Sequence, residues 1–543
     1  MKYPQFTLPD MLDRTVSGSA RETALVYSGA DISYAQLADH VNRLAAGLQA
    51  LGIAKGDRVA LLMPNCPQFV ISYFGALRAG AIVTATSSMY TAREVTHQWN
   101  DAGASVVIAD RRLLPVIKTA LPQLTSVRRI ILTGMTQYTP RHFKELCRSL
   151  RTVVKKPRLK SLTLRAAEPG AVELMEWEGL LRLSRKPRPH GLKRSDIACL
   201  QYTGGTTGTS KGAMLTHANL VINACQANAW LTAGIADGRV TSVAALPMFH
   251  IYAMTCVMIA SIEIGGRVII LPRFELRAAL NVIRKYRPTI YHGVPTMYVA
   301  FNGAPNVKRY GFHSLRVCMS GGAPLPVEVR QQFEALTGGR LLEGYGLTET
   351  SPVTHINPPD GLCKTGSMGM TIADTEARIM DLETGTREMP VGEIGEIAIR
   401  GPQVMKGYWN KPEETALVLR DGWLYTGDVA RKDADGYFYI VDRKKDMIIA
   451  GGFNIYPREV EEVLFECPRV KEAAVVGVPD PYRGETVKAF VVLKDGEKTT
   501  AEEIVAFCRE RLAAYKVPRL VEFLDSLPKS GVGKYLRREL KNA

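Results

Sequence analysis

Two hydrophobic periodicities alternate along the first two thirds of the chain. Leu37, Val41, Leu44 and Leu48 recur at helical spacing, and the apolar run that follows at 58–63 has the length of a strand. The same order returns in strand-like runs at 81–86, 105–110, 240–247, 267–272, 289–295 and 315–322. Because strands that are separated by helices usually pair in parallel, this pattern predicts a layered α/β architecture.

The pattern changes near Asp374. Short strand-like runs and turns follow at 377–385 and 392–401, which is typical of a small β-rich subdomain. After Asp442 a compact α+β segment of roughly a hundred residues begins. We therefore expect a large N-terminal domain with a β-rich subdomain, followed by a small C-terminal domain.

Length and composition indicate a multidomain globular protein. The 543 residues exceed what one core supports, and 46% hydrophobic with 22% charged residues is ordinary for a soluble chain. The longest apolar run, 252–262, is shorter than the roughly 20 residues of a membrane span. The start of the chain has prolines and an aspartate but no apolar h-region, so we expect no signal peptide. Nine cysteines without a CxxC pair or metal-ligand spacing predict reduced thiols in a cytoplasmic protein.

The net charge of +16 is concentrated in one segment. Between Arg141 and Arg194, 15 lysines and arginines face five glutamates. Such a segment is by default a solvated surface connection. The sharper hypothesis is peripheral contact with an anionic membrane, where each basic group adds about 1 kcal/mol. Nucleic acid is disfavoured as a partner, since neither zinc-finger spacing nor an RNP-type aromatic strand accompanies the charge.

The stretch Tyr202–Gly212, YTGGTTGTSKG, has the composition of a phosphate-binding loop. It departs from the Walker A order, because Ser210 precedes Lys211 and a glycine follows it. We expect it to connect a strand at 198–202 to a helix over 212–228. Its glycines let backbone N–H groups turn toward an anion, and its hydroxyls and lysine add donors. These groups suit a flexible loop that holds leaving β,γ-phosphates during attack at an α-phosphate.

Seven further blocks follow this loop in the sequence. They are LPMFHIYA (246–253), SGGAPL (320–325), EGYGLTETSP (343–352), GEIGEIAIRGPQVMKGYW (392–409), DGWLYTGDVA (421–430), DGYFYIVDRKKDMIIAGGFNIYPREVEEVL (435–464) and PKSGVGK (528–534). In this order they resemble the adenylate-forming superfamily of acyl-CoA synthetases, peptide-synthetase adenylation domains and luciferases. Gly204 and LPMFHIYA are most similar to bacterial long-chain fatty acyl-CoA synthetases. Ser210 stands where the family usually has proline, which alters loop stiffness more than chemistry.

The resemblance implies the domain boundaries. Residues 1–441 would form the N-terminal domain that binds ATP and the acyl group. Residues 442–446 would form a hinge centred on Lys445, and residues 447–543 a mobile lid. Rotation of the lid would let one site serve two half-reactions, with Gly451 and Gly452 bordering a CoA tunnel after the turn.

The resemblance also implies the nucleotide site. Tyr345 would stack on adenine, while Asp428 and Arg443 would bind the ribose hydroxyls. Thr348 would contact the α-phosphate. Magnesium, a hard cation that prefers oxygen ligands, would be held by Glu349 and Thr203. The remaining ATP contacts would come from Gly204, Gly205, Thr206, Thr207, Gly208, Lys211, Gly321, Gly322, Ala323, Glu343, Gly344 and Gly346.

Two further residues are candidates for roles in catalysis. A histidine in an apolar setting such as that of His250 is more often a core residue, but the resemblance places it at the acyl pocket. There we expect it to position the carboxylate, with Tyr252 and Met254 lining the pocket or else forming ordinary helix core. The resemblance places Lys534 over the carboxylate and the α-phosphate. A preorganised cation at that point stabilises the charge of a pentavalent transition state.

These assignments predict an ATP- and Mg²⁺-dependent ligase that joins a medium- or long-chain fatty acid to CoA through an acyl-adenylate. A ligase for aromatic or other acids, a fatty acyl-AMP ligase that loads a carrier protein and a luciferase-like oxygenase are the alternatives. An adenylate or lipid sensor is disfavoured, because Glu349, Asp428, Arg443 and Lys534 are all present. The sequence does not indicate the preferred acyl chain length or whether the protein forms a homodimer.

Overall fold

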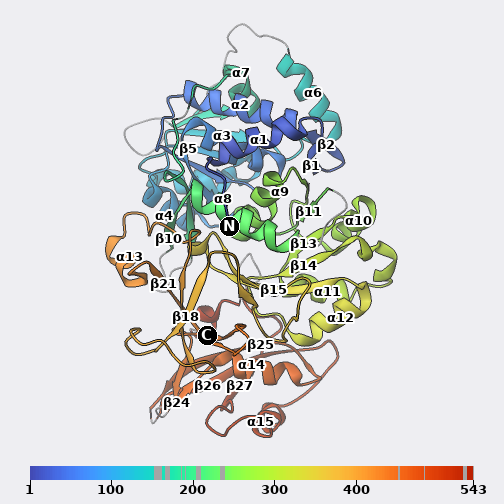
Figure 1. Ribbon diagram of the computed structural model, residues 1–543, viewed down its shortest axis with the longest axis vertical. Helices are drawn as coiled ribbons and strands as arrows, with labels where there is room; N and C mark the ends of the chain where they lie inside the picture. Colours follow the sequence, from blue (N-terminus) through green and yellow to red (C-terminus); the bar gives the residue numbers. More distant parts are fainter. Residues whose placement is uncertain are drawn as a thin grey trace.

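The computed structural model has a large N-terminal part and a small C-terminal lid at one end of it (Figure 1). The lid comprises residues 447–541. The residues that the structure describes are 1–151, 162–164, 172–184, 186–189, 191–203, 210–232, 239–450, 453–481, 483–529 and 535–541. Two large sheets, one small β-rich sheet and the sheet of the lid account for the strands of this part, so the predicted α/β fold class is confirmed.

The first large sheet has the strand order β10-β9-β4-β3-β5-β6-β8-β7. Its central strands pair in parallel, as the alternation of helices and strands predicts, and both edges are antiparallel. The strands are β3 (Arg58–Leu62), β4 (Ile82–Thr86), β5 (Val106–Asp110), β6 (Arg129–Thr133), β7 (Leu162–Leu164), β8 (Val172–Glu176), β9 (Ile197–Thr203) and β10 (Lys211–Thr216).

Helices cover both faces of this sheet. On β3, Val59 and Leu61 join the main core, whereas Ala60 and Leu62 join a second cluster that contains Trp99. The two-residue period of a strand therefore buries both faces. The helices of this region are α1 (Leu8–Ser19), α2 (Tyr34–Ala50), α3 (Pro67–Ala79), α4 (Ala92–Ala102), η1 (Arg111–Leu113), α5 (Leu114–Ala120), η2 (Leu121–Gln123), α6 (Pro140–Arg151) and α7 (Trp177–Leu183).

The second large sheet has the order β17-β16-β15-β14-β13-β11-β12-β1-β2. The chain enters it early, because β1 pairs in parallel with β12 and so ties the N-terminus to a distant segment. Its strands are β1 (Thr23–Tyr27), β2 (Ala30–Ser33), β11 (Thr241–Ala244), β12 (Arg267–Ile270), β13 (Ile290–Gly293), β14 (Val317–Ser320), β15 (Arg340–Gly346), β16 (Val353–Ile356) and β17 (Met370–Thr371).

The helical segments around this sheet include one π-helix, η3 (Ala253–Ile259), in the apolar stretch behind His250. The others are α8 (His217–Leu231), α9 (Ala260–Glu263), α10 (Leu276–Tyr286), α11 (Pro295–Asn302), η4 (Val307–Tyr310), η5 (Phe312–Ser314), α12 (Val327–Thr337) and η6 (Thr348–Thr350). No helix of the described residues is long and apolar enough to cross a membrane.

The β-rich subdomain and the lid each have their own sheet and their own apolar cluster. The subdomain contains β18 (Glu376–Met380), β19 (Ile394–Arg400), α13 (Pro412–Val418), β20 (Leu419–Arg420), β21 (Trp423–Lys432) and β22 (Phe438–Arg443). The lid contains β23 (Ile448–Ala450), β24 (Phe453–Ile455), α14 (Pro457–Glu466), β25 (Val470–Asp480), β26 (Gly484–Leu493), α15 (Ala501–Arg509), β27 (Leu520–Phe523) and α16 (Arg537–Lys541).

One local prediction is wrong. The residues after the YTGGTTGTSKG loop do not begin a helix: Lys211–Thr216 form β10, which pairs antiparallel with β9. The helix starts only at His217, where Thr216 and Asn219 form a capping box. Helical spacing continued back through residues 212–216, but pairing with β9 satisfies their backbone and overrides it.

Candidate active site

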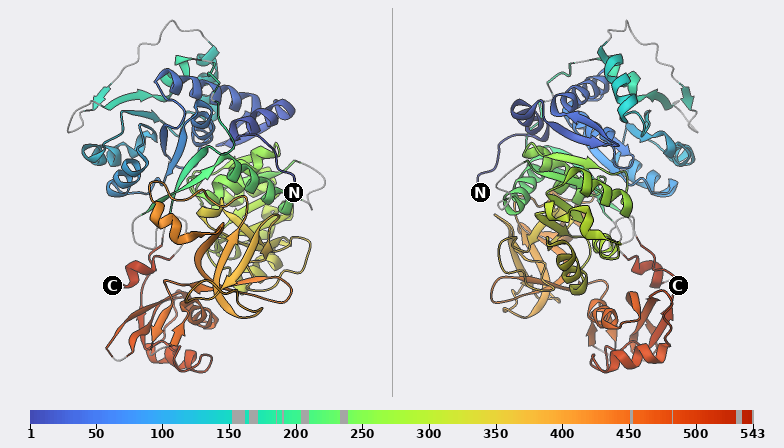
Figure 2. Two further views of the ribbon diagram at one scale, coloured as in Figure 1. Left: turned by 60° about the vertical axis from the view of Figure 1, so that its left-hand side comes forward. Right: turned by 90° about the vertical axis from the view of Figure 1, so that its right-hand side faces the viewer.

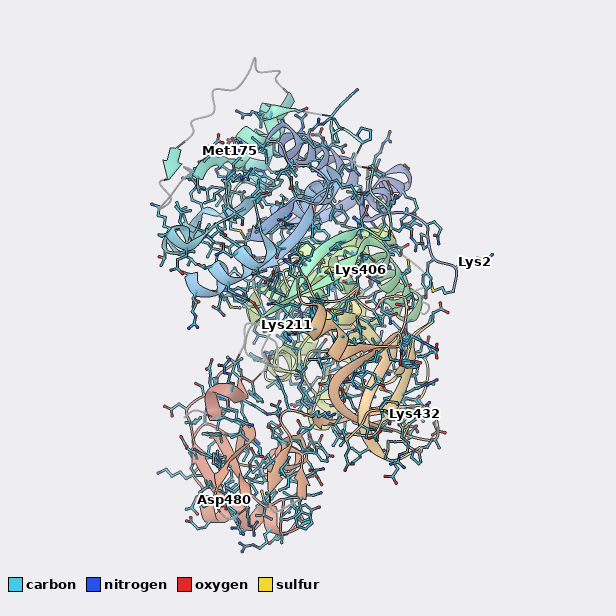
Figure 3. All side chains as sticks on the ribbon, turned by 90° about the vertical axis from the view of Figure 1, so that its left-hand side faces the viewer. Lys2, Met175, Lys211, Lys406, Lys432 and Asp480 are labelled. Atoms are coloured by element: carbon cyan, nitrogen blue, oxygen red, sulfur yellow. The ribbon has the colours of Figure 1, made fainter. Side chains whose placement is uncertain are left out.

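A cleft of about 2680 Å³ lies between the large part and the lid. The ends of β9, β14 and β15 and the subdomain strands line one side, and α14 with the segment around Tyr535 lines the other. Figure 2 shows α16, at the C-terminal end, turned from the lid toward the large part. In Figure 3, Lys211 lies on the edge of the large part that faces the lid. Residues that are distant in the sequence therefore meet in one space.

Tyr345, Asp428 and Arg443 form one hydrogen-bonded group in this cleft. The Tyr345 hydroxyl donates to Asp428 Oδ2 at 2.6 Å, and Arg443 Nε lies 3.0 Å from Asp428 Oδ1. Asp428 and Arg443 face each other in the antiparallel register of β21 and β22, so the sheet itself fixes the ion pair. Burial, together with the Asp428 carboxylate, raises the pKa of Tyr345, which stays a neutral ring at the cleft wall.

The glycines beside Tyr345 have a structural reason. A Cβ on Gly346 would lie 1.9 Å from the Pro352 carbonyl oxygen, and one on Gly344 would lie 3.0 Å from Met319. The close approach of β16 to β15 therefore requires glycine at 346. The Tyr345 ring also packs on His355, with 5.7 Å between ring centroids.

The loop after β14 also forms part of the cleft wall. Gly321, Gly322 and Ala323 line the cleft, and Gly322 has a φ of +80°, a left-handed conformation that favours glycine. Glu343 at the end of β15 also lines the cleft and accepts a long hydrogen bond of 3.4 Å from the Leu325 amide. Burial raises the pKa of Glu343 to about 7, well above the usual range of a carboxyl group.

Glu349 is held by a residue that the sequence did not indicate. The Tyr408 hydroxyl donates to Glu349 Oε1 at 2.7 Å, and the Met405 amide donates to the Glu349 carbonyl. Tyr408 in turn lies under the Lys211 ammonium, 5.3 Å from its ring centroid, and Lys211 forms an ion pair with Glu414 of α13. The lysine is therefore anchored to the subdomain and not free in the loop.

These oxygens fit a magnesium ion that is shared with a nucleotide. Glu349 supplies a fixed carboxylate, and Thr348 and Thr203 line the same cleft with hydroxyls. In the described part of the chain, no three His, Cys, Asp or Glu side chains are placed so that they could hold a metal ion together. That donor set suits Mg²⁺, which is commonly held by one or two carboxylates together with substrate phosphates.

The apolar end of the cleft is formed by the segment after His250. His250 and Tyr252 line the cleft, and the His250 ring accepts from the Tyr252 amide at 3.3 Å. Met254 is fully buried in the main core and is not among the residues that line the cleft. The π-helical turn directs Cys256 to the cleft in its place. Helical spacing could not foresee this, because a π-helix changes the residues that share a face.

Several predicted residues lie outside the described residues. They are Gly204, Gly205, Thr206, Thr207, Gly208, Gly451, Gly452 and Lys534. The flanks of these segments are described: Thr203 pairs with Lys211, Ala450 pairs with Phe453, and Lys529 forms a β-bridge with Tyr535. Tyr535, the residue after Lys534, lines the cleft.

Comparison with known proteins decides the family. A family model described as AMP-binding enzyme matches residues 12–409, and a second, described as AMP-binding enzyme C-terminal domain, matches residues 459–534. The chain belongs to the AMP-binding enzyme family. This AMP-binding enzyme is 47% identical over 541 residues to the long-chain-fatty-acid--CoA ligase of Bacillus subtilis (strain 168). The match covers 99% of this chain and 95% of the relative.

Two further similarities bear on the site. A feruloyl-CoA synthase of Amycolatopsis sp is 38% identical and covers 96% of both chains. The crystal structure of ATP bound MatB from Rhodopseudomonas palustris superposes with a TM-score of 0.85 at 30% identity, over 99% of both chains. The predicted resemblance to adenylate-forming enzymes is therefore confirmed.

Three cleft residues of this AMP-binding enzyme escaped the sequence reasoning. Tyr408 lies in the segment 392–409, and its position after Lys406 and Gly407 carried no signal for a partner 59 residues away. His292 read as part of a buried strand. Asp442 was predicted only as the first residue of the hinge, with no partner assigned to it. The place of these three residues in the cleft depends on how the strands pack together, which the sequence alone does not show.

Proposed function

We propose that this AMP-binding enzyme is an ATP-dependent fatty acid–CoA ligase that works through an acyl-adenylate. The observation that carries the proposal is the continuity of one cleft, which joins the Tyr345–Asp428–Arg443 group to an apolar wall. That wall contains Leu231, Cys256, Met319, Val353 and Ile356. A nucleotide and an acyl chain thus have adjoining surfaces of the right polarity.

In the first half-reaction, a carboxylate oxygen of the acid would attack the α-phosphorus of ATP. A C–O–P linkage forms, the bond to the β-phosphate oxygen breaks, and pyrophosphate leaves. In the second, the CoA sulfur would attack the acyl carbon, the C–O bond to AMP breaks, and the thiol proton passes to solvent. Activation is needed because a free carboxylate has no good leaving group.

The described residues would divide the binding task. Tyr345 would offer its ring face to adenine, and the Asp428 carboxylate, already oriented by Arg443, would accept from the ribose hydroxyls. Glu349, held by Tyr408, would share a magnesium ion with the phosphates. Bound there, the ion would neutralise charge on the phosphate oxygens. His250 and Thr348 would position the carboxylate and the α-phosphate.

A ligase for hydroxylated aromatic acids is the second candidate. Tyr252 and His292 place polar atoms at the apolar end of the cleft, with Tyr252 Oη and His292 Nδ1 3.4 Å apart. Burial lowers the pKa of His292 to about 4, so the ring is neutral and retains hydrogen-bonding capacity without charge. The 38% identity to a feruloyl-CoA synthase also favours this reading.

Pyrophosphate release across a panel of acids, with and without CoA, tests both candidates. We expect release with medium- and long-chain acids, stimulation by CoA and formation of AMP and acyl-CoA. Stronger release with ferulate than with any fatty acid would favour the second candidate. Release that yields acyl-adenylate but no thioester would favour an acyl-AMP ligase, and light emission in oxygen would favour a luciferase-like activity.

We also propose that the basic segment between Arg141 and Arg194 contacts anionic membrane. Fatty acids partition into bilayers, so an enzyme that consumes them gains from peripheral binding. We expect vesicle co-sedimentation that rises with anionic lipid and falls with salt, since the Debye length shrinks to about 3 Å at 1 M. Glutamine at four positions outside the described residues should reduce it: Lys155, Lys156, Arg158 and Lys160.

A charge-matched variant controls for net charge. It replaces four basic residues in or next to α10 and η4 with glutamine: Arg273, Arg277, Lys308 and Arg309. The control should sediment as the wild type does. Equal sedimentation of all three proteins at low salt would contradict membrane binding and indicate that the segment is only a solvated surface connection.

A further inference from the structure

The lid adopts one particular orientation. Tyr535, Leu536 and Arg537 line the cleft, so the segment that follows Lys534 faces the large part. In the β23–β24 hairpin, Ile449 and Phe453 are 52% and 53% exposed and do not line the cleft, whereas Asn454 does. Under the proposed function, this is the orientation in which Lys534 would serve adenylation, and the hairpin with Gly451 and Gly452 would face the cleft only after rotation at Lys445.

Most contacts around the hinge lie within the lid and would move with it. Arg537 makes a bidentate pair with Glu461, at 2.8 and 2.7 Å, and lies 3.4 Å from Asp446. Arg458 Nε donates to Glu462 at 3.0 Å. All five residues follow Lys445, so a rotation about Lys445 leaves these distances unchanged.

Among the described residues, three contacts that involve a side chain link the segment before Lys445 to the lid, and two of them involve Asp442, the penultimate residue of β22. The Arg458 amide, at the second position of α14, donates to Asp442 Oδ2 at 2.8 Å. Arg537 Nη1 lies 3.8 Å from Asp442 Oδ1. The third is the Arg458 guanidinium, which donates to the Ile440 carbonyl at 2.8 Å. Rotation of the lid about Lys445 must break all three.

We propose that Asp442 is the positioning residue that holds the lid in the adenylation orientation. Its carboxylate caps the N-terminus of α14 across the hinge, and this favours the orientation by hydrogen bonding and by attraction to the helix dipole. The expected effect on the two half-reactions rests on the proposed function, whereas the contact between Asp442 and α14 does not.

The surroundings of Asp442 fit this role. Its side chain is 2% exposed, and its Oδ1 also accepts the Arg443 amide at 2.7 Å. Burial raises the pKa of Asp442 to about 6, while Arg537 and the two amide donors oppose the shift and Glu461 adds to it. Tyr456 is the other titratable neighbour. The carboxylate is therefore mainly charged at neutral pH, and hydrogen bonds to a charged acceptor are the stronger kind.

Asp442→Ala and Asp442→Asn test the proposal through the two half-reactions. Loss of a charge-assisted hydrogen bond lowers the equilibrium constant for the adenylation orientation by on the order of 10- to 100-fold. We expect Asp442→Ala to slow adenylation by that factor, while thioester formation from supplied acyl-adenylate is unchanged or faster. Asp442→Asn keeps an acceptor for the Arg458 amide and should retain an intermediate rate.

Glu462→Gln is the matched control. It removes a charged partner of Arg458 that does not cross the hinge, and its side chain is 63% exposed. Both half-reactions should stay at wild-type rates. Equal losses of both half-reactions in Asp442→Asn and Asp442→Ala, or wild-type adenylation in Asp442→Ala, would overturn the proposal.

A distance measurement separates this inference from the proposed function. Fluorophores at Leu417 of α13 and Asp495 of the lid, which are 64% and 96% exposed, report the lid orientation without any substrate. The Asp442→Ala variant should show a second distance that the wild type and Glu462→Gln lack. That result would support the role of Asp442 even if no acid were activated, and an unchanged distance distribution would contradict it.

Discussion

Replacing Lys534 with alanine is expected to reduce adenylation by on the order of 10²- to 10³-fold, the usual effect of removing one preorganised donor from a developing charge. The position is adjacent to Tyr535, which lines the cleft and forms a β-bridge with Lys529. Thioester formation from supplied acyl-adenylate should stay nearly intact, because the charge matters only where carboxylate and α-phosphate meet. Pyrophosphate release and thioester formation are measured separately.

Lys498→Ala provides the control for the loss of a lid lysine. Lys498 is exposed and is not part of the cleft lining. It should leave both half-reactions unchanged. Equal loss of the two half-reactions in Lys534→Ala would contradict the assigned role and indicate a folding defect.

Replacing Lys445 with proline is expected to leave adenylation running and to stop the CoA step. Proline fixes φ near −65° at the proposed pivot, so the lid could not rotate. The amides of Lys444 and Asp446 donate to the Gly427 and Arg443 carbonyls, and the substitution at 445 removes neither of these donors. The described orientation should therefore persist.

Lys445→Ala removes the same charge without fixing φ and should retain the CoA step. Burial and the Arg443 charge lower the pKa of Lys445, so the charged form of this side chain is disfavoured. Replacing it with alanine therefore removes an unfavourable charge and not an ion pair that stabilises the fold. Wild-type rates of both half-reactions in Lys445→Pro would show that the pivot lies elsewhere. Lys445→Pro should hold the lid in the adenylation orientation, whereas Asp442→Ala should weaken that orientation. The two variants therefore bias the lid in opposite directions.

The fold class and the family were predictable from the sequence. Apolar residues at 3.6- and 2-residue periods mark the helices and strands of both large sheets, and residues such as Val59 and Ala60 alternate between two cores as a buried strand requires. Glycine-rich and charged blocks in a fixed order then indicated the adenylate-forming enzymes. Local chemistry carries both signals, so neither needs the tertiary structure.

The partners inside the site depended on packing between distant segments. Tyr345 meets Asp428 across 83 residues, and Tyr408 meets Glu349 across 59, because strand register and subdomain docking bring them together. Hydrophobic periodicity specifies which face of an element is buried but not which element covers it. For the same reason β10 replaced the expected helical start, since its backbone could pair with β9. The contact between Asp442 and α14 joins residues on the two sides of the proposed hinge, and therefore only the tertiary structure could decide it.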